Sequence, residues 1–344
     1  MILKRFGKEP TGERLERIKN AENTQNGTFQ NIEPTAVQPE DVSMFKIMKQ
    51  MLSRPKTVRP SSEIPHKKAD LLNINTKKPT VVWFGHSSYL LSFNGYNILV
   101  DPVFSGFASP FKFFGKSFPG TDLYQAEDFP QIDLLILTHD HYDHLDYKFL
   151  KQLKAKVLKI VTPLGVGEHL EYWNTQPDII TELNWNESEE VHQNLKVTAL
   201  PSRHFSGRNV KRHTSLWASF ALEWEGFKIY IGSDSGYSSQ FKEIGEKFKE
   251  FDLAFLECGQ YGKYWPQIHM FPEETAKAAK DLNAKILFPV HWGKFVLSVH
   301  PWNEPIRRLM AETRIQKQEV VSPRIGEAYV LGEQFSQEEW WNFE

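Results

Sequence analysis

The sequence predicts an α/β fold in which two mixed β-sheets pack together and are flanked by helices. Eleven short apolar runs have the pattern of strands, and Gly, Asn or Pro turns separate many of them; they lie at 80–84, 89–93, 97–101, 133–138, 158–163, 195–201, 215–224, 227–234, 253–259, 285–292 and 326–331. Five segments with helical spacing of apolar residues are interspersed, at 147–156, 165–173, 238–250, 272–283 and 304–316. This order of strands and helices favours an α/β sandwich.

The chain divides into two parts of different character. Residues 1–78 are polar, contain several prolines and show little strand pattern. We expect them to form an extended segment that packs on the core, with one short helix at 44–52. The strand and helix patterns fill residues 79–344, which we expect to form the main domain. With 344 residues, 40% of them hydrophobic, the chain is long enough to bury a sizeable core.

The composition argues against several classes of protein. A net charge of -2 offers no broad basic surface, so we do not expect nucleic-acid binding. The single cysteine, Cys258, cannot form an internal disulfide and fits a reducing compartment. The first twenty residues lack the pattern of a secretory signal, and no stretch of 18 apolar residues follows. We therefore expect a cytoplasmic protein, whose oligomeric state the sequence does not indicate.

The segment LTHDHYDHLD, residues 137–146, holds three of the twelve histidines of the chain. The apolar run DLLIL precedes it, so these polar residues begin where a buried strand ends. His139 and His141 are two residues apart, which places both on one side of an extended chain. Asp143 and His144 are adjacent, where the chain turns into a helix, so they can point toward a different position. Imidazole and carboxylate groups at this density indicate a metal site.

Three further residues of metal-ligand type follow strands elsewhere in the sequence. His204 follows the run LKVTALP, Asp234 ends FKIYIGSD, and His291 lies near the end of KILFPVHW. Because strand ends gather at the edge of a sheet, these residues can converge on the first cluster. Seven ligands exceed the four that one zinc ion normally takes, and a carboxylate such as Asp234 can bridge two ions. The sequence therefore predicts two metal ions, about 3.5–4 Å apart, that act on a phosphoryl or carbonyl group.

These motifs resemble the metallo-β-lactamase superfamily, whose fold is an αβ/βα sandwich of two mixed sheets flanked by helices. Within it, the similarity is strongest to the N-acyl-phosphatidylethanolamine-hydrolysing phospholipase D group and its bacterial relatives. The matching stretches run from the N-terminus to about residue 295; they are RFGKEPTGERLERI, TVVWFGHSSYLL, ILVDPVFSGFASP, LTHDHYDHLD, HFSGR, GSDSGY, IHMFPEETA and HWGKF. The resemblance implies that residues 79–344 form a hydrolase domain of this fold.

The resemblance also implies how the seven ligands divide between two zinc ions. One ion would be held by three histidines, namely His139, His141 and His204. The other would be held by one carboxylate and two histidines, namely Asp143, His144 and His291. Asp234 would bridge the two ions. The expected cofactor is thus two Zn²⁺ per chain, and other divalent ions such as Mn²⁺ or Fe²⁺ are alternatives.

Four residues are predicted to assist the chemistry. Asp143 can hold a metal ion with one oxygen and orient the attacking water with the other, which makes it a predicted catalytic residue. His269 is the candidate acid for the leaving alcohol, and a purely structural role for it is equally favoured. His86 in GHSSYLL is expected to orient a metal ligand. In the basic segment SRHFSGRNVKR, Arg208 is the candidate for a contact to a substrate phosphate.

The segment SGFASPFKFFGKSFPG, residues 105–120, concentrates aromatic side chains. Its five phenylalanines are interleaved with Lys112 and Lys116. A loop folded onto the core is the slightly favoured interpretation. The functional alternative is a lip, including Phe113 and Phe114, that contacts acyl chains or a membrane surface.

Together these features predict a zinc-dependent phosphodiester hydrolase. The resemblance makes phospholipase D-type cleavage of N-acylphosphatidylethanolamine, to N-acylethanolamine and phosphatidic acid, the favoured reaction. The expected partner is a phospholipid or another phosphodiester, with peripheral membrane contact. A metal-dependent lactonase or another phosphoesterase stays open, because metal ligands do not determine the substrate. The alternative from a different class is a lipid-binding protein with structural zinc, which a closed and water-free metal shell would favour.

Overall fold

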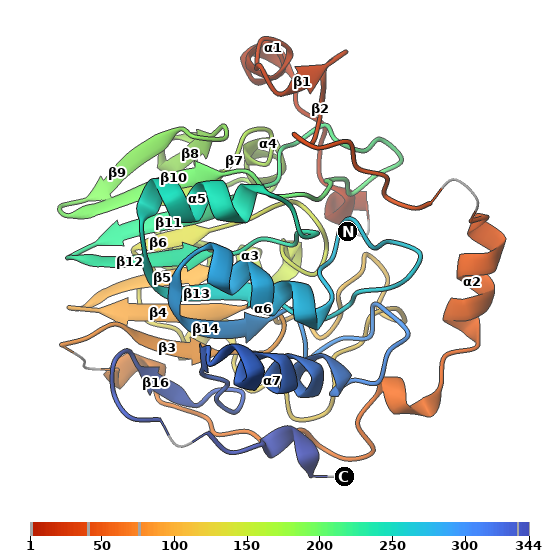
Figure 1. Ribbon diagram of the computed structural model, residues 1–344. Helices are drawn as coiled ribbons and strands as arrows, with labels where there is room; N and C mark the ends of the chain where they lie inside the picture. The colour runs from red at the N-terminus through yellow and green to blue at the C-terminus, as the bar shows by residue number, and fades with distance from the viewer. Residues whose placement is uncertain (1–2, 40–41, 75–76, 336, 344) are drawn as a thin grey trace.

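The computed structural model describes residues 3–39, 42–74, 77–335 and 337–343, which form two seven-stranded sheets flanked by helices (Figure 1). In the first sheet the strands lie in the order β16 (Ala328–Val330), β3 (Thr80–Trp83), β4 (Tyr89–Phe93), β5 (Tyr96–Val100), β6 (Leu134–Ile136), β7 (Ile160–Pro163) and β8 (Ile180–Leu183). In the second sheet the order is β15 (Glu319–Val320), β14 (Ala284–Val290), β13 (Phe251–Glu257), β12 (Phe227–Ile231), β11 (Ser219–Trp224), β10 (Leu195–Leu200) and β9 (Ser188–His192).

Both sheets are mixed in the same way. From β16 to β5 neighbouring strands are antiparallel, and from β5 to β8 they are parallel. In the second sheet the strands from β9 to β12 are antiparallel and those from β12 to β15 are parallel. Parallel strands inside such a sandwich are covered on both faces, so they are apolar without alternation. β6, with the sequence Leu-Leu-Ile and every residue buried, shows this pattern.

Helices cover the outer face of each sheet. α5 (Gln240–Phe248), α6 (Pro272–Asp281) and α7 (Glu304–Gln316) lie side by side over the second sheet (Figure 1). On the first sheet, α3 (Tyr147–Leu153) packs Phe149 and Leu153 into a cluster with Leu99 of β5 and Leu135 of β6. α4 (Gly167–Tyr172) lies near β8. This layering confirms the predicted αβ/βα sandwich.

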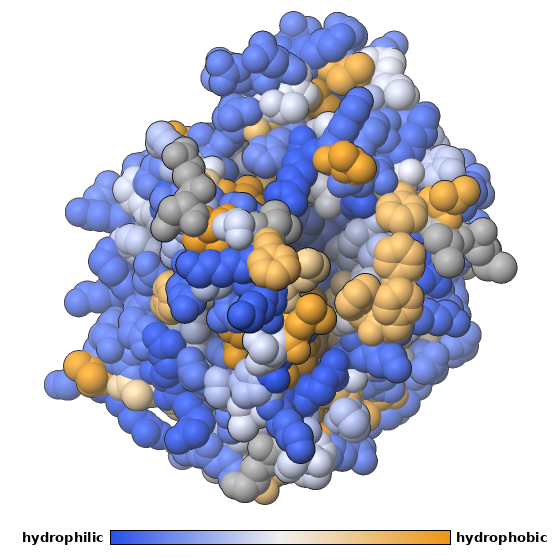
Figure 2. Space-filling model, turned by 90° about the vertical axis from the view of Figure 1, so that its right-hand side faces the viewer, coloured by the Kyte–Doolittle hydropathy of each residue, from blue (hydrophilic) through white to orange (hydrophobic). Residues whose placement is uncertain are grey.

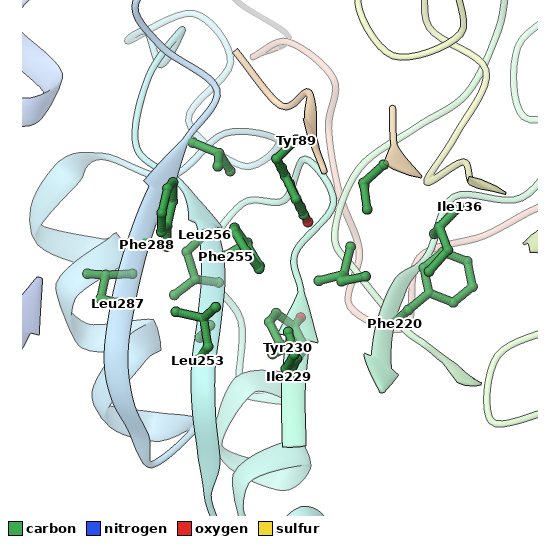
Figure 3. Packing of buried hydrophobic residues seen from close by; sticks show 14 of the residues in the cluster. Tyr89, Ile136, Phe220, Ile229, Tyr230, Leu253, Phe255, Leu256, Leu287 and Phe288 are labelled. Atoms are coloured by element: carbon green, nitrogen blue, oxygen red, sulfur yellow. The ribbon is translucent and has the colours of Figure 1, made fainter. Parts of the chain in front are cut away.

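The main core lies between the two sheets. Figure 3 shows Tyr89 of β4 beside Phe255 of β13, and their rings stack with centroids 3.9 Å apart. Ile136 of β6 and Phe220 of β11, also drawn there, are completely buried. Burial of each such side chain stabilises the folded state by about 1.5–3 kcal/mol. Packing of this kind fixes the two sheets against each other, and with them the loops in which the strands end.

The N-terminal segment lies over the sandwich and contains more regular structure than expected. The predicted helix at 44–52 is present as α2 (Met44–Leu52), which Ser43 caps by accepting a hydrogen bond from the amide of Lys46. A second helix, α1 (Gly12–Lys19), and the short hairpin of β1 (Thr24–Gln25) and β2 (Thr28–Phe29) were not predicted. Ion pairs of Arg14 with Glu168 and Glu182 hold α1 on the domain.

All eleven predicted strands and the five predicted helices of the main domain are present, although several are shorter than predicted. The strands missed are β8, β9 and β15. β9 has the polar sequence SEEVH at an outer edge of its sheet, and β15 has only two residues, so neither has an apolar run. Among the described residues, the helices are all too short or too polar to cross a membrane.

Candidate metal centre

The structure brings all seven predicted ligands together at the ends of strands from both sheets. Their ligand atoms fall into two groups, each with all atoms within 4.8 Å of one another. The first group consists of His139, His141, His204 and Asp234. The second consists of His86, Asp143, His144 and His291. The division matches the one implied by the family resemblance, with His86 as an additional neighbour of the second group.

Three imidazole nitrogens converge in the first group. Nδ1 of His141 lies 3.0 Å from Nε2 of His139 and 3.2 Å from Nε2 of His204. Burial lowers the pKa of each of these three histidines, so they are neutral at pH 7. A neutral imidazole has one nitrogen that carries a lone pair, and three lone pairs directed at one point repel each other. A bound cation removes this repulsion, so the donor set fits a metal ion.

Hydrogen bonds fix which nitrogen faces the cluster in two of the rings, His204 and His144. Nδ1 of His204 lies 2.9 Å from the carbonyl oxygen of Ile268, to which it can only donate. Nδ1 of His144 lies 2.7 Å from a carboxylate oxygen of Asp101. Both contacts keep a proton on Nδ1 and direct Nε2 toward the centre, as in metal-binding histidines generally. Asp101 and Ile268 therefore prepare these rings for a metal ion.

Several buried polar atoms of the second group have no hydrogen-bond partner in the described part of the chain. They include Nε2 of His144 and Nε2 of His291. A buried polar atom without a partner is costly, and native proteins rarely keep one without an ion or water. A metal ion bound at this point would satisfy these atoms. The observation supports a metal ion at the second group independently of the sequence motifs.

The two carboxylates are held in their charged form. Burial by itself would raise the pKa of Asp143, but the charge of His144 and the hydrogen bond from His86, 2.9 Å long, hold it well below its usual range. Burial would also raise the pKa of Asp234, but the nearby His144 and His291 outweigh burial and hold this pKa well below its usual range. Each carboxylate is therefore an anionic ligand at pH 7.

Asp234 lies between the two groups. Its Oδ2 is 3.2 Å from Nε2 of His144 and 3.8 Å from Nε2 of both His139 and His204. Its Oδ1 is 2.9 Å from Nδ1 of His291. This central position is the one expected of a carboxylate that bridges two ions.

Backbone contacts between the two sheets hold the centre in place. The amide of His86 donates to the carbonyl of Trp292, and the amide of His291 donates to the carbonyl of His86. His86 and His291 both have a left-handed backbone, with φ of 54° and 65°. Such a conformation costs on the order of 1–3 kcal/mol in a residue other than glycine and persists only where the surroundings impose it. The loops after β3 and β14 are thus fixed around the metal ligands.

A cavity of about 320 Å³ leads to the centre. Its floor includes ligands of both groups, such as His141, Asp143 and Asp234. Its walls are largely apolar or aromatic and are formed by Val37, Ile47, Met51, Phe205, Tyr264, Trp265, Ile268 and Leu297. Figure 2 faces the side on which α2 lies and shows hydrophobic residues around a hollow. The metal centre is therefore open to a ligand with an apolar part.

The prediction for Arg208 is corrected by the structure. Its guanidinium is buried and donates to the carbonyl oxygens of Arg5, Asp140 and Leu145, so its hydrogen bonds are used within the protein. It does not line the cavity. The basic side chain of the same segment that does is Arg212. The spacing from His204 could not reveal which of these arginines turns inward.

In the Phe-rich segment 105–120, some phenylalanines pack into the core and others are exposed on the surface. Phe107 and Phe118 are buried, as a loop folded onto the core requires. Phe113 and Phe114 are 69% and 61% exposed and pack against each other with centroids 4.8 Å apart. Neither lines the cavity, so the structure places them on the surface and not beside the metal ligands.

His86 and His269 both lie beside the predicted ligands. His86 contacts Asp143, as expected of a residue that orients a ligand. His269 lines the cavity, and its Nδ1 lies 2.7 Å from Oε2 of Glu257, which is buried. Burial raises the pKa of Glu257. Burial by itself would lower the pKa of His269, but the nearby carboxylate of Glu257 outweighs this effect and raises the pKa of His269.

Two residues of the site, Asp101 and Glu257, were missed in the sequence. Each stands at the end of an apolar strand, Asp101 directly after β5 and Glu257 as the last residue of β13. The signal that revealed Asp234 and His291 was therefore present for them as well.

Comparison with known proteins identifies the family. A sequence model of the beta-lactamase superfamily domain matches residues 96–292, more than half of the chain. The chain belongs to this superfamily. An uncharacterized protein of Mycobacterium tuberculosis is 38% identical over 310 residues, which cover 89% of this chain and 83% of that protein. A mitochondrial N-acyl-phosphatidylethanolamine-hydrolyzing phospholipase D of Saccharomyces cerevisiae is 35% identical over 256 residues, or 71% of this chain and 54% of that enzyme.

The superfamily fold is also found among solved structures. Igni18, a metallo hydrolase of the archaeon Ignicoccus hospitalis, matches with a TM-score of 0.57 at 20% identity, over 75% of this chain and all of that one. The fold, the family match and the two ligand groups all indicate the same class of protein. The protein is a metal-dependent hydrolase of the metallo-β-lactamase fold, and its His and Asp clusters are consistent with a binuclear metal site.

Proposed function

We propose that this hydrolase uses two zinc ions to cleave a phosphodiester, and that the substrate is an N-acylated phosphatidylethanolamine. The observation that carries the proposal is the cavity, in which metal ligands and apolar walls face the same space. A phosphodiester that carries acyl chains would place its anionic phosphate at the metal ligands and its acyl chains against the apolar walls. The 35% identity to a phospholipase D that hydrolyses N-acyl-phosphatidylethanolamine supports the same substrate class.

The charge of the centre suits a phosphodiester. Bound zinc ions would more than offset the two carboxylates, which leaves a positive site for an anionic group. They would also lower the pKa of water to about 7 and polarise a phosphoryl oxygen. The side chains of His141 and Asp143 line the cavity, which supports a catalytic centre with access for substrate over a closed structural site.

The protein's own residues would divide the remaining work. Asp143 would orient the attacking water and accept its proton, which then passes to solvent. The water oxygen forms a bond to phosphorus as the bond from phosphorus to the leaving alcohol breaks, with its electron pair on the alcohol oxygen. His269 would give that oxygen a proton from Nε2 and recover one from solvent. The products are phosphatidic acid and N-acylethanolamine.

A substrate panel tests the proposal. We expect the zinc-loaded protein to release N-acylethanolamine and phosphatidic acid from a short-chain N-acylphosphatidylethanolamine, as measured by mass spectrometry. A simple phosphodiester and a lactone are tested beside it. A higher kcat/KM for the lactone would contradict the phosphodiester assignment. Binding of the lipid without turnover of any substrate would favour a lipid-binding protein with structural zinc.

The exposed phenylalanines lead to a prediction about membrane contact. Phe113 and Phe114 are flanked by Lys112 and Lys116, an arrangement that suits the surface of an anionic bilayer. Burial of one Phe is worth about 1.5–3 kcal/mol, so replacing both with Ser is expected to weaken binding to anionic vesicles about tenfold or more. Cleavage of a short soluble phosphodiester should stay near wild type, because neither ring lines the cavity.

The measurement is the ratio of vesicle activity to soluble activity in the double variant. Replacing Ile315, which is 77% exposed on α7, with Ser controls for the loss of an exposed apolar side chain. An equal fall on both substrates would mean that the double variant is merely destabilised. Unchanged activity on both would remove the proposed peripheral membrane contact.

A further inference from the structure

The ring of His269 lies between the metal ligands and the cavity. Its centroid is 5.0 Å from that of His204 and 5.1 Å from that of His291, on which it stacks. It lies in the loop between β13 and α6, and its side chain is 13% exposed. Among the residues that the structure describes, none forms a hydrogen bond with its Nε2, whereas Nδ1 contacts Glu257. The loop therefore presents one nitrogen to the protein and leaves the other for a ligand.

Glu257 is buried, and its two carboxylate oxygens and its carbonyl oxygen accept hydrogen bonds from this loop, from the loop after β12 and from α6. Oε1 accepts hydrogen bonds from the amides of Ser235, at 2.9 Å, and Met270, at 3.0 Å. Oε2 accepts from Nδ1 of His269, and the carbonyl oxygen accepts from the hydroxyl of Thr275. Ser235 directly follows the bridging candidate Asp234. One side chain thus connects the loop that carries a metal ligand with the loop that carries His269.

We propose that Glu257 is a positioning residue that holds His269 with Nδ1 protonated and Nε2 directed at the leaving oxygen of the substrate. The inference rests on the proposed phosphodiesterase function and assigns a role to a residue outside the family ligand set. A carboxylate accepts hydrogen bonds only, so it keeps a proton on Nδ1 of the neighbouring ring, and Nε2 is left to carry the proton that the leaving oxygen takes. Glu257 also restricts the orientation of the ring, because it binds Nδ1 of His269 and the backbone amide of the next residue, Met270, at the same time.

The expected consequence depends on the leaving group. An alkoxide is a poor leaving group and needs a proton as its bond to phosphorus breaks, so correct placement of Nε2 contributes to the rate. A 4-nitrophenolate leaves without a proton. Loss of the carboxylate should therefore slow cleavage that releases an alcohol and spare cleavage that releases 4-nitrophenolate. A residue that only supports the fold would affect both reactions equally.

The experiment compares Glu257→Gln with wild type on two matched substrates. Both carry the same short-chain phosphatidyl group, and the leaving group is N-acylethanolamine in one and 4-nitrophenol in the other. Glutamine keeps an oxygen for the amides of Ser235 and Met270 but offers N–H to Nδ1 of His269. We expect kcat for the alcohol substrate to fall at least about 10²-fold while the 4-nitrophenyl substrate is nearly unaffected.

Glu274→Gln is the matched control. Oε2 of Glu274 accepts from the amide of Phe271 at the start of α6, so it supports the same loop without touching His269. This variant should keep its activity on both substrates. An equal loss on both substrates in Glu257→Gln would overturn the proposal.

Metal content separates the positioning role from a role as a ligand. Atoms of Asp234, Glu257, His269 and His291 also lie within 4.8 Å of one another and form a third group that could hold an ion. The positioning role requires that Glu257→Gln retain the metal content of wild type. A fall in bound metal would show that Glu257 is a ligand instead and would overturn the proposal.

A spectroscopic readout is independent of turnover. Nitrogen NMR of histidine-labelled, zinc-loaded wild type, with the His269 signals assigned from His269→Gln, should show a proton on Nδ1. In Glu257→Gln, where an amide N–H faces the ring, Nδ1 should lose its proton. A wild-type spectrum with an unprotonated Nδ1 would contradict the inference, even if Glu257→Gln failed to fold. If wild type cleaved neither phosphodiester, the proposed function would fail, and the spectra would still decide the role of Glu257.

Discussion

Replacing Asp143 with Asn is expected to remove most hydrolytic activity while the fold stays intact. Asparagine has nearly the same shape but loses the negative charge that a metal ion and the attacking water require. Its amide also changes the contact with Nε2 of His86, now 2.9 Å from Oδ2 of Asp143. Loss of a group that moves a proton in the transition state costs about 10²–10⁴-fold in rate, and the metal contribution adds to this.

The measurement combines turnover of a model phosphodiester with circular dichroism. Asp178→Asn makes the same chemical change at an exposed position outside the cavity and should behave as wild type. Turnover by Asp143→Asn at the wild-type rate would show that the residue is wrongly assigned. If the circular dichroism spectrum changed together with the activity, the loss would have to be attributed to the fold.

Metal removal is the second large effect expected. We predict about two zinc ions per chain by elemental analysis, because seven ligands, one of them shared, match two ions. Chelation should abolish activity, and addition of zinc should restore it. The metal-free protein should also melt at a lower temperature, because an ion bound to the native state alone stabilises it by mass action. The unpartnered buried nitrogens of His144 and His291 give this effect a structural cause.

Stoichiometry and stability are measured on the same samples by elemental analysis and thermal unfolding. Magnesium at the same concentration is the control, since its preference for oxygen ligands makes it a poor match for a histidine-rich site. A content that stays at one ion per chain under zinc supplementation would contradict the two-metal mechanism. An unchanged melting temperature after removal would mean that the ions do not bind the native state in preference to the unfolded chain.

Much of the fold was predictable because buried strands carry a strong local signal. β6 and β14 are covered on both faces, so their sequences are continuous apolar runs. β9 lies at an edge and alternates exposed and half-buried residues, which is why its sequence contains no such run. α1 is polar and is held by ion pairs of Arg14 with glutamates more than 150 positions away, a contact that no local pattern contains.

The sequence by itself predicted the candidate metal-ligand set that the structure brings together, because these residues lie at or shortly after the ends of apolar strands and strand ends converge in a layered fold. Only the tertiary structure showed which other side chains contact these residues or line the cavity beside them. The side chain of Arg208 turned to backbone carbonyls, that of Arg212 to the cavity, and Ile47 and Met51 reached the cavity wall from a distant helix. The carboxylate of Glu257 met His269 across two loops. The reason is physical: strand periodicity is a local property of the chain, whereas the direction of a side chain in a loop depends on contacts between segments far apart in the sequence.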